Sequence, residues 1–265
     1  MKRYIFLIST VAIIAAIIAA ILILINSMEI AASFVHSSKR EKSNICVLVD
    51  SGHGKIINNV YQTSGKQSPE WPDGLKIYEG YSNGMLAHEL VSLLQEQDID
   101  AFVLNSDLYD YSNLERAERV NKYFRLDSRI VFLSLHHNAQ PTDNADYIDK
   151  YGLKGFLKGG ASGVEIYTSK GQTKSDVIAS FIYFELLNEF PEIQMRTDWT
   201  DGDADKEANF TVLVKTDCPA ILIEFLFMTT YKDCVKIADK NIRQRYVAAI
   251  VRAFKNYNNF LNLKS

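Results

Sequence analysis

Hydrophobic residues along the chain follow two periods that alternate, and together they predict strands and helices in turn. Short apolar runs rich in β-branched residues and bounded by turn-forming residues are typical of strands. We expect such strands at residues 44–50, 99–104, 130–135, 164–168, 210–214 and 220–224. Segments between them carry apolar residues three and four positions apart, which is the pattern of amphipathic helices. This alternation predicts an α/β fold with a mostly parallel central sheet flanked by helices.

Four helices are predicted between or after these strands. The first has an apolar face made of Met85, Leu86, Leu90, Leu93 and Leu94. Another begins at Ser112, three residues before Glu115 in the spacing of a capping box, and directs Leu114 inward. The next begins near Thr173 and buries Val177. The last covers residues 241–260. The apolar residues of each predicted helix lie on one face, which is available to pack against the sheet.

A long apolar run precedes the predicted domain, from Tyr4 to Ile25, and contains no charged residue. A helix of about 22 residues is about 33 Å long, which is enough to span the hydrocarbon core of a membrane. Typical cleaved signals have shorter apolar cores of about 7–15 residues. We therefore expect residues 1–25 to be an N-terminal transmembrane anchor or uncleaved signal. A long cleaved signal, with a poor cleavage site at Ala31-Ala32-Ser33, is the alternative.

The charges beside this run predict its orientation. Lys2 and Arg3 precede it, and positive charge holds that end of a transmembrane helix in the cytoplasm. We expect a single-pass cell membrane protein with a cytoplasmic N-terminus and an extracytoplasmic domain. Residues 26–43 are polar and basic without a clear period, which is typical of a juxtamembrane linker. Residues 44–265 show no repeat or break in composition, and we interpret them as one domain.

Composition and charge exclude several classes of protein. A chain that is 47% hydrophobic and 23% charged is neither disordered nor of low complexity. Its net charge of −3, without basic clusters, argues against nucleic acid as a partner. The three cysteines, Cys46, Cys218 and Cys234, match no CxxC zinc pattern and can form at most one intramolecular disulfide, so we expect them to be buried as small apolar residues.

Side chains able to bind a metal follow the ends of predicted strands. His53 follows the first strand, His136 ends the strand at 130–135, and Glu224 ends the last one. Glu79 stands just before the Met85 helix. Because the carboxyl ends of strands gather at one edge of an α/β sheet, these groups can meet there. Two imidazoles and a carboxylate make an open zinc site, beside which another carboxylate can accept a proton from water. The residues alone leave a second interpretation open, in which they are polar side chains solvated at the sheet edge.

Four separated motifs occur in an order that resembles a known family. They are Val49–Gly54 (VDSGHG), Glu79 in the sequence IYE, Ser134–Ala139 (SLHHNA) and Pro219–Glu224 (PAILIE). The chain from Asn44 to about Ala253 is similar to the zinc-dependent N-acetylmuramoyl-L-alanine amidases of the amidase 3 family.

This resemblance implies a function for each of these residues. It implies that His53, Glu79 and His136 hold Zn²⁺ and that Glu224 is the catalytic carboxylate. The implied reaction is hydrolysis, by zinc-activated water, of the amide bond between N-acetylmuramic acid and L-alanine of the peptidoglycan stem peptide. Residues 44–265 would then be a zinc amidase catalytic domain of the phosphorylase/hydrolase-like type, on the periplasmic or wall side of the membrane. Peptidoglycan is the implied partner, and a protein activator is unknown.

The chain departs from the family pattern at three positions near these motifs. Ser51 stands where many relatives have proline, Lys55 where they have a second glycine, and Leu226 where they have the glycine of Glu-x-Gly-Phe. These changes alter the shape of loops that would meet the substrate. Two other functions therefore remain open: a membrane-anchored zinc peptidase or carboxypeptidase, and a non-catalytic peptidoglycan-binding regulator, which the loss of the glycine at Leu226 favours.

Two further segments carry charges of interest. Asp201, Asp203 and Asp205 alternate like the start of an EF-hand, but Lys206 replaces its obligatory glycine and residue 212 is valine in place of its bidentate glutamate. We interpret them as an acidic loop beside the cleft that does not bind calcium. Arg196 is either a binding group for a substrate carboxylate or an exposed arginine without specific contacts.

Overall fold

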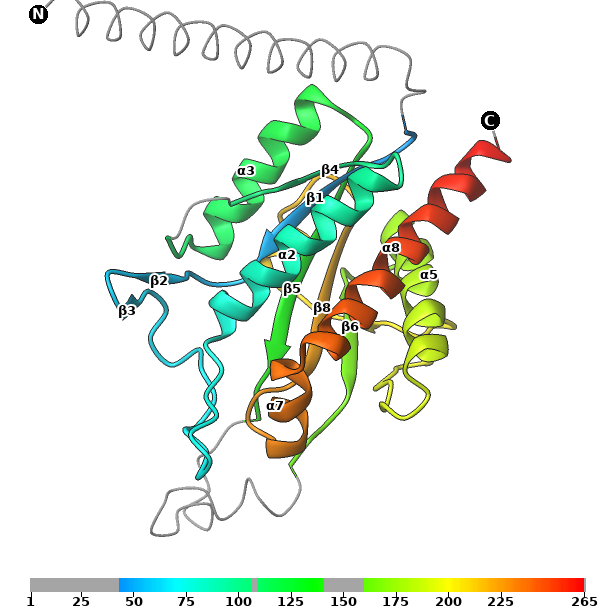
Figure 1. The fold of residues 1–265 in the computed structure, drawn as a ribbon. Coiled ribbons are helices and arrows are strands. Elements are labelled where there is room, and N and C mark those ends of the chain that lie inside the picture. Colours follow the sequence, from blue (N-terminus) through cyan, green and yellow to red (C-terminus); the bar gives the residue numbers. More distant parts are fainter. Residues whose placement is uncertain (1–42, 106–108, 141–159, 265) are drawn as a thin grey trace, which may run out of the picture. The chain divides into compact units, whose positions relative to one another are not determined.

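The computed structural model describes residues 43–105, 109–140 and 160–264, and their centre is one sheet with the strand order β4-β1-β5-β8-β6-β7 (Figure 1). Strands β1 (Cys46–Ser51), β4 (Asp100–Val103), β5 (Ile130–Asn138) and β8 (Ala220–Phe227) run parallel to one another. The strand β6 (Val164–Thr168) is antiparallel to β8, and β7 (Lys206–Glu207) is parallel to β6. The predicted mostly parallel sheet is confirmed, with one antiparallel pair inside it.

Helices cover both faces of this sheet, and the strand sequences show why. Along β1, Val47 and Val49 belong to one hydrophobic core, whereas Cys46 and Leu48 belong to another. The first core packs against α2 (Glu79–Glu96), α5 (Lys174–Glu189), α7 (Tyr231–Ala238) and α8 (Lys240–Asn262). The second packs against α3 (Asn113–Leu126) and the short α6 (Thr211–Val214). Burial on both faces explains why the strands are nearly continuous apolar runs instead of alternating ones.

The predicted starts of two helices are confirmed by their caps. The Ser112 hydroxyl accepts the backbone N–H of Glu115, whose carboxylate accepts the Ser112 N–H in return, so α3 begins with a capping box. Thr173 and Asp176 form the same arrangement at the start of α5. These reciprocal bonds satisfy N–H groups that a helix start otherwise leaves unpaired.

One predicted strand is wrong. Within residues 210–214, Thr211–Val214 form the helical turn α6, which begins after Phe210. The adjacent residues Val212 and Leu213 are both buried against the second core, and Val214 is 43% exposed. A strand would direct neighbouring side chains to opposite faces, whereas a helical turn lets two consecutive apolar residues face the same core.

Some residues that were predicted to lie on the buried faces of helices are exposed. Leu114 is 52% exposed and Val177 is 42% exposed, although both were expected to point inward. Met85 is 37% exposed, so only part of the predicted apolar face of α2 is buried.

The cysteines behave as expected: Cys46, Cys218 and Cys234 are buried and form no disulfide. The long loop after β1 contains a small hairpin of β2 (Ile56–Ile57) and β3 (Val60–Tyr61). The predicted anchor at residues 1–25 and the linker up to residue 42 lie outside the described residues. In the part of the chain that is described, no helix is both long and apolar enough to cross a membrane.

Candidate active site

The loop after β1 places His53 at the carboxyl edge of the sheet. His53 has a φ of +67°, a left-handed conformation that few non-glycine residues adopt. A Cβ atom on the preceding Gly52 would overlap the His136 imidazole ring. Glycine at position 52 therefore lets the backbone lie directly against His136, and this brings the two histidines together with ring centroids 5.0 Å apart.

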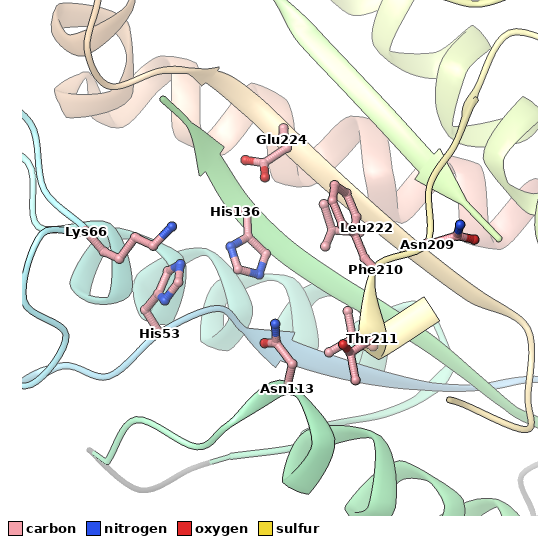
Figure 2. A pocket seen from close by; sticks show the side chains of 10 residues that line it. His53, Lys66, Asn113, His136, Asn209, Phe210, Thr211, Leu222 and Glu224 are labelled. Carbon is pink, nitrogen blue, oxygen red and sulfur yellow. The ribbon is translucent and has the colours of Figure 1, made fainter. Parts of the chain in front are cut away.

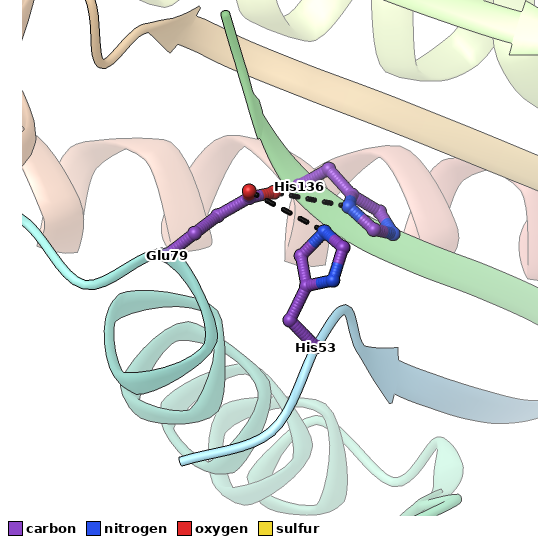
Figure 3. Close-up of side chains that lie close together, drawn as sticks. All are labelled: His53, Glu79 and His136. Atoms are coloured by element: carbon purple, nitrogen blue, oxygen red, sulfur yellow. Dashed lines mark hydrogen bonds and ion pairs between the residues drawn. The ribbon is translucent and has the colours of Figure 1, made fainter. Parts of the chain in front are cut away.

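Glu79 lies between the two histidines. It is the first residue of α2 and is 2% exposed. Its Oε1 atom is 3.1 Å from His136 Nδ1, and its Oε2 atom is 3.3 Å from His53 Nε2 (Figure 3). Burial disfavours its ionised form, but hydrogen bonds with His136 and His53 outweigh burial and hold the pKa of Glu79 well below its usual range. The carboxylate is therefore fixed as an anion facing two imidazole nitrogens.

The three side chains suit a metal ion. One ligand atom from each of His53, Glu79 and His136 lies within 4.8 Å of the others. Ligands about 2.0–2.1 Å from a tetrahedral zinc ion are about 3.3–3.4 Å apart, close to the two nitrogen–oxygen distances observed here. Two imidazoles and one carboxylate also leave a fourth position for water. The structure thus brings the three predicted ligands into one group able to bind a metal.

His137 follows His136 but belongs to the protein interior. Its Nδ1 atom is 2.6 Å from the Phe225 carbonyl oxygen, and its Nε2 atom is 2.8 Å from the Ser82 hydroxyl. Its backbone N–H donates to Glu79 Oε1 at 3.2 Å. Burial lowers the pKa of the His137 imidazole. His137 therefore supports Glu79 and does not face the pocket.

Glu224 is the register partner of His136 across the β5–β8 pair. It lines a pocket of about 310 Å³ together with His53 and His136 (Figure 2). Among the described residues, no donor reaches its buried Oε2 atom. Burial, followed by the negative charges of Glu79 and Glu165, raises the pKa of Glu224 well above its ordinary value. This carboxyl group is therefore a stronger proton acceptor than an exposed glutamate.

The backbone beside Glu224 contains a bulge. The pairing of β5 with β8 shifts between His136 and Asn138, and Phe227 is the partner of Asn138. Leu226 lies in this bulge with a φ of +65° and is fully buried. Leucine thus adopts a left-handed conformation, which favours glycine, at the position where the resembling family has glycine.

Glu165, which was not predicted as a site residue, lies beside Glu224 in the β6–β8 pair. Glu165 is 5% exposed and accepts hydrogen bonds or ion pairs from four side chains. They are Arg196 at 2.8 Å, Lys206 at 2.7 Å, Tyr167 at 2.8 Å and Asn138 at 2.6 Å. Burial acts against ionisation, but these donors prevail and lower the pKa of Glu165. The only signal in the sequence was an acidic residue inside an apolar strand.

The structure gives Arg196 a role that neither sequence interpretation included, because its guanidinium pairs with Glu165. Lys66 and Asn113 were also missed, and both point into the pocket (Figure 2). They come from the loop before α2 and from the start of α3, outside the four motifs of the family resemblance. His88 lies outside the site, where its Nε2 atom is 3.4 Å from Lys55 Nζ.

Comparison with known proteins agrees with this geometry. Residues 47–256 match the family model described as N-acetylmuramoyl-L-alanine amidase. The chain is 24% identical over 215 residues to the probable cell wall amidase LytH of Staphylococcus epidermidis, covering 80% of this chain and 57% of LytH. The chain therefore spans little more than half the length of that relative.

Solved structures show the same fold. An N-acetylmuramoyl-L-alanine amidase from Clostridium difficile 630 has a TM-score of 0.63 and 25% identity, covering 83% of this chain and 98% of that one. The amidase Ami1 from Mycobacterium smegmatis has a TM-score of 0.60 and 15% identity, covering 83% of this chain and 99% of that one, and it supports the fold alone. With four motifs converging at one sheet edge and a family match over most of its length, the chain belongs to the N-acetylmuramoyl-L-alanine amidase family.

Proposed function

We propose that this protein is a peptidoglycan hydrolase that cleaves the amide bond between N-acetylmuramic acid and L-alanine of the stem peptide. The observation that carries the proposal is one pocket that combines His53, His136 and Glu224, with Glu79 buried behind the histidines. The family match supports the choice of substrate.

We infer that His53, Glu79 and His136 hold Zn²⁺ and that Glu224 is the catalytic carboxylate. The spacing and donor types of the three side chains fit this ion. When bound, zinc supplies Lewis-acid chemistry, which polarises the scissile carbonyl and makes water easier to deprotonate. Glu79 Oε1 accepts the His137 N–H, so the backbone of β5 holds the carboxylate in place for this function.

Glu224 moves the proton. Its carboxylate accepts a proton from water as the water oxygen attacks the carbonyl carbon, and then transfers that proton to the leaving nitrogen as the C–N bond breaks. The products are a lactyl carboxylate and a free L-alanine amine. Burial, followed by the negative charges of Glu79 and Glu165, raises the proton affinity of Glu224 and thereby favours the first of these transfers, from water.

The remaining polar side chains of the pocket suit substrate binding. The Lys66 ammonium and the Asn113 amide supply donors to carbonyl or carboxylate groups of a stem peptide. Phe210 and Leu222 line the same pocket and add apolar surface. Such a mixture of a few polar groups with apolar walls is typical of small-ligand sites.

The test is digestion of purified peptidoglycan by the full-length, zinc-loaded protein, followed by mass spectrometry of the new ends. We expect free L-alanine amines from the wild type and a loss of about 10²–10⁴-fold in Glu224→Gln with unchanged zinc content. New ends within the peptide, with the lactyl amide whole, would instead identify a peptidase. Binding without any release would identify a non-catalytic regulator.

We also propose that residues 1–25 anchor the protein in the cell membrane, with the domain on the periplasmic or wall side. Its support is the uncharged run from Tyr4 to Ile25 with Lys2 and Arg3 before it. Protease treatment of intact wall-free cells tests it. Before protease treatment, we expect the intact protein to be found in the membrane fraction. Protease added outside the cells should then digest the domain, and protection of the domain would contradict the orientation.

A further inference from the structure

Three aspartates meet at the end of β6 that lies farther from Glu224. In the β6–β8 pair Glu165 is opposite Glu224, whereas Tyr167 is opposite Leu222, so β6 ends toward the start of β8. Asp203 and Asp205 lie just before β7, and Asp176 lies in the first turn of α5. One carboxylate oxygen of each aspartate lies within 4.8 Å of the others.

Each aspartate already uses one oxygen within the fold. Asp176 Oδ2 accepts the Thr173 N–H in the capping box. Asp205 Oδ2 accepts the Thr168 hydroxyl at 2.6 Å. Asp203 Oδ2 accepts the side-chain amide of Gln172 at 3.4 Å. These bonds fix the orientation of the three carboxylates.

The other oxygens of two of these aspartates have no donor. Asp203 Oδ1 and Asp205 Oδ1 are buried, and no group of the described chain donates a hydrogen bond to either atom. Asp205 is 4% exposed, so water does not surround it. Buried polar atoms are nearly always paired in folded proteins, and two unpaired carboxylate oxygens within a cluster of three carboxylates indicate a missing positive charge.

The protein itself does not supply that charge in the part of the chain that is described. No lysine, arginine or histidine there forms an ion pair with Asp176, Asp203 or Asp205. Lys206 follows Asp205 directly, but its ammonium group pairs with Glu165 instead. The cluster thus differs from the nearby Glu165 network, in which basic side chains neutralise the buried carboxylate.

We propose that Asp176, Asp203 and Asp205 bind one Ca²⁺ ion. Calcium takes oxygen ligands at about 2.3–2.6 Å, so two oxygens bound to one ion are at most about 5 Å apart. The three aspartate oxygens lie within 4.8 Å of one another and can therefore share one ion. Backbone carbonyls and water commonly complete such irregular sites. Such a site is not an EF-hand, because Asp176 joins Asp203 and Asp205 from a different element.

This ion would hold in place the segment from Asp203 to Phe210, which ends in the wall of the pocket. Asp203 and Asp205 hold one end of a stretch that continues through Lys206 to Asn209 and Phe210, which line the pocket. Asp176 belongs to α5, which packs against the sheet. The ion therefore connects the pocket wall to a rigid helix, and its binding is independent of whether the pocket cleaves peptidoglycan.

The test measures calcium binding directly. Purified full-length protein is freed of divalent cations, reloaded with one equivalent of Zn²⁺, and dialysed against radioactive Ca²⁺. We expect one bound Ca²⁺ per chain and a rise in unfolding temperature of about 5 °C or more when Ca²⁺ is present at about 100 times its dissociation constant. A wild type that binds no calcium would overturn the proposal.

Variants locate the ion. Asp203→Asn and Asp205→Asn should each weaken calcium binding at least about tenfold, because each removes a charged ligand. Asp201→Asn changes an exposed aspartate of the same loop and should leave binding unchanged. If Asp205→Asn does not fold, the less buried Asp203 still decides. Equal losses in Asp201→Asn and Asp203→Asn, or none in Asp203→Asn, would show that calcium binds elsewhere.

Discussion

Arg116 on α3 pairs with the buried carboxylate of Asp50 at the end of β1 and also donates to the Ser51 carbonyl oxygen at 3.0 Å. Asp50 accepts two further hydrogen bonds, from Ser134 at 2.8 Å and from Asn105 at 3.1 Å. This network holds the backbone immediately before Gly52 and His53. The position of the first histidine thus depends on an ion pair beneath it.

Replacing Arg116 by methionine should strongly destabilise the protein. Asp50 would remain as a buried, uncompensated charge, and breaking such a pair typically costs about 3–5 kcal/mol. Chemical denaturation measures the change in unfolding free energy. Arg125→Met, at an exposed position of the same helix, should change it by less than about 0.5 kcal/mol. A loss at Arg116 no larger than that of the control would contradict the structural role.

Leu226 should reverse the usual order of alanine and glycine substitutions. Leu226→Ala removes a buried side chain, which costs about 2–5 kcal/mol, and keeps a non-glycine residue at φ +65°. Leu226→Gly loses the same packing but relieves the strain, worth about 1 kcal/mol. We therefore expect the glycine variant to be the more stable of the two in thermal unfolding. The opposite order would mean that the bulge is not strained.

Lys66 should tune the pH profile of the amidase reaction. Its positive charge opposes the rise in the pKa of Glu224, so Lys66→Met should raise that pKa further. Because Glu224 must be ionised to accept a proton, the acidic limb of kcat/KM should move to higher pH. Initial rates on peptidoglycan from pH 4 to 9 measure this, with Lys76→Met as the control. If the acidic limb of kcat/KM does not move, the charge of Lys66 does not affect the pKa of Glu224.

Metal removal should abolish activity, and Zn²⁺ should restore it. His136→Ala removes one of the three proposed ligands, so we expect zinc content after dialysis to fall well below one equivalent. His88→Ala changes a histidine outside the site and should retain zinc. Elemental analysis gives the zinc content, and circular dichroism checks the fold. Full zinc retention in His136→Ala would require a different set of ligands.

Asp205 should make the calcium-free protein less stable as pH rises. Burial, followed by the neighbouring Asp203, raises the pKa of Asp205 from 3.8 to about 7. Protonation therefore favours the folded state: the contribution is fully present below pH 3.8 and is lost as pH rises to about 7. The difference in unfolding free energy between wild type and Asp205→Asn should decline across this window and then level off. A constant difference would contradict the raised pKa.

Much of the site was predictable because its residues follow strand ends. His53, His136 and Glu224 each stand at or just beyond a predicted strand, and parallel strands bring such positions to one edge. Glu79 was expected at the same edge because it stands just before a predicted helix, and the family resemblance supplied its role as a metal ligand. The structure then explained Gly52, whose missing side chain makes room for the His136 ring.

Other parts depended on contacts that no local pattern reveals. Glu165, Arg196 and Lys206 come from three separate segments, and only tertiary structure makes them one network. The same holds for Asp176 and Asp205, which the spacing of an EF-hand does not connect. The apolar residues 210–214 suited either a strand or a helical turn, and packing against the second core decided between them.

Contacts at the two ends of β6 limit how its length can vary among natural sequences. Glu165 near its start lies beside Glu224, whereas Thr168 at its end holds Asp205. Side chains alternate along a strand, so inserting a single residue between them would turn one end of β6 to the opposite face. Either Glu165 or Thr168 would then lose its partners. We therefore expect length variation among natural variants to be excluded from these five residues and accommodated in the loops on either side.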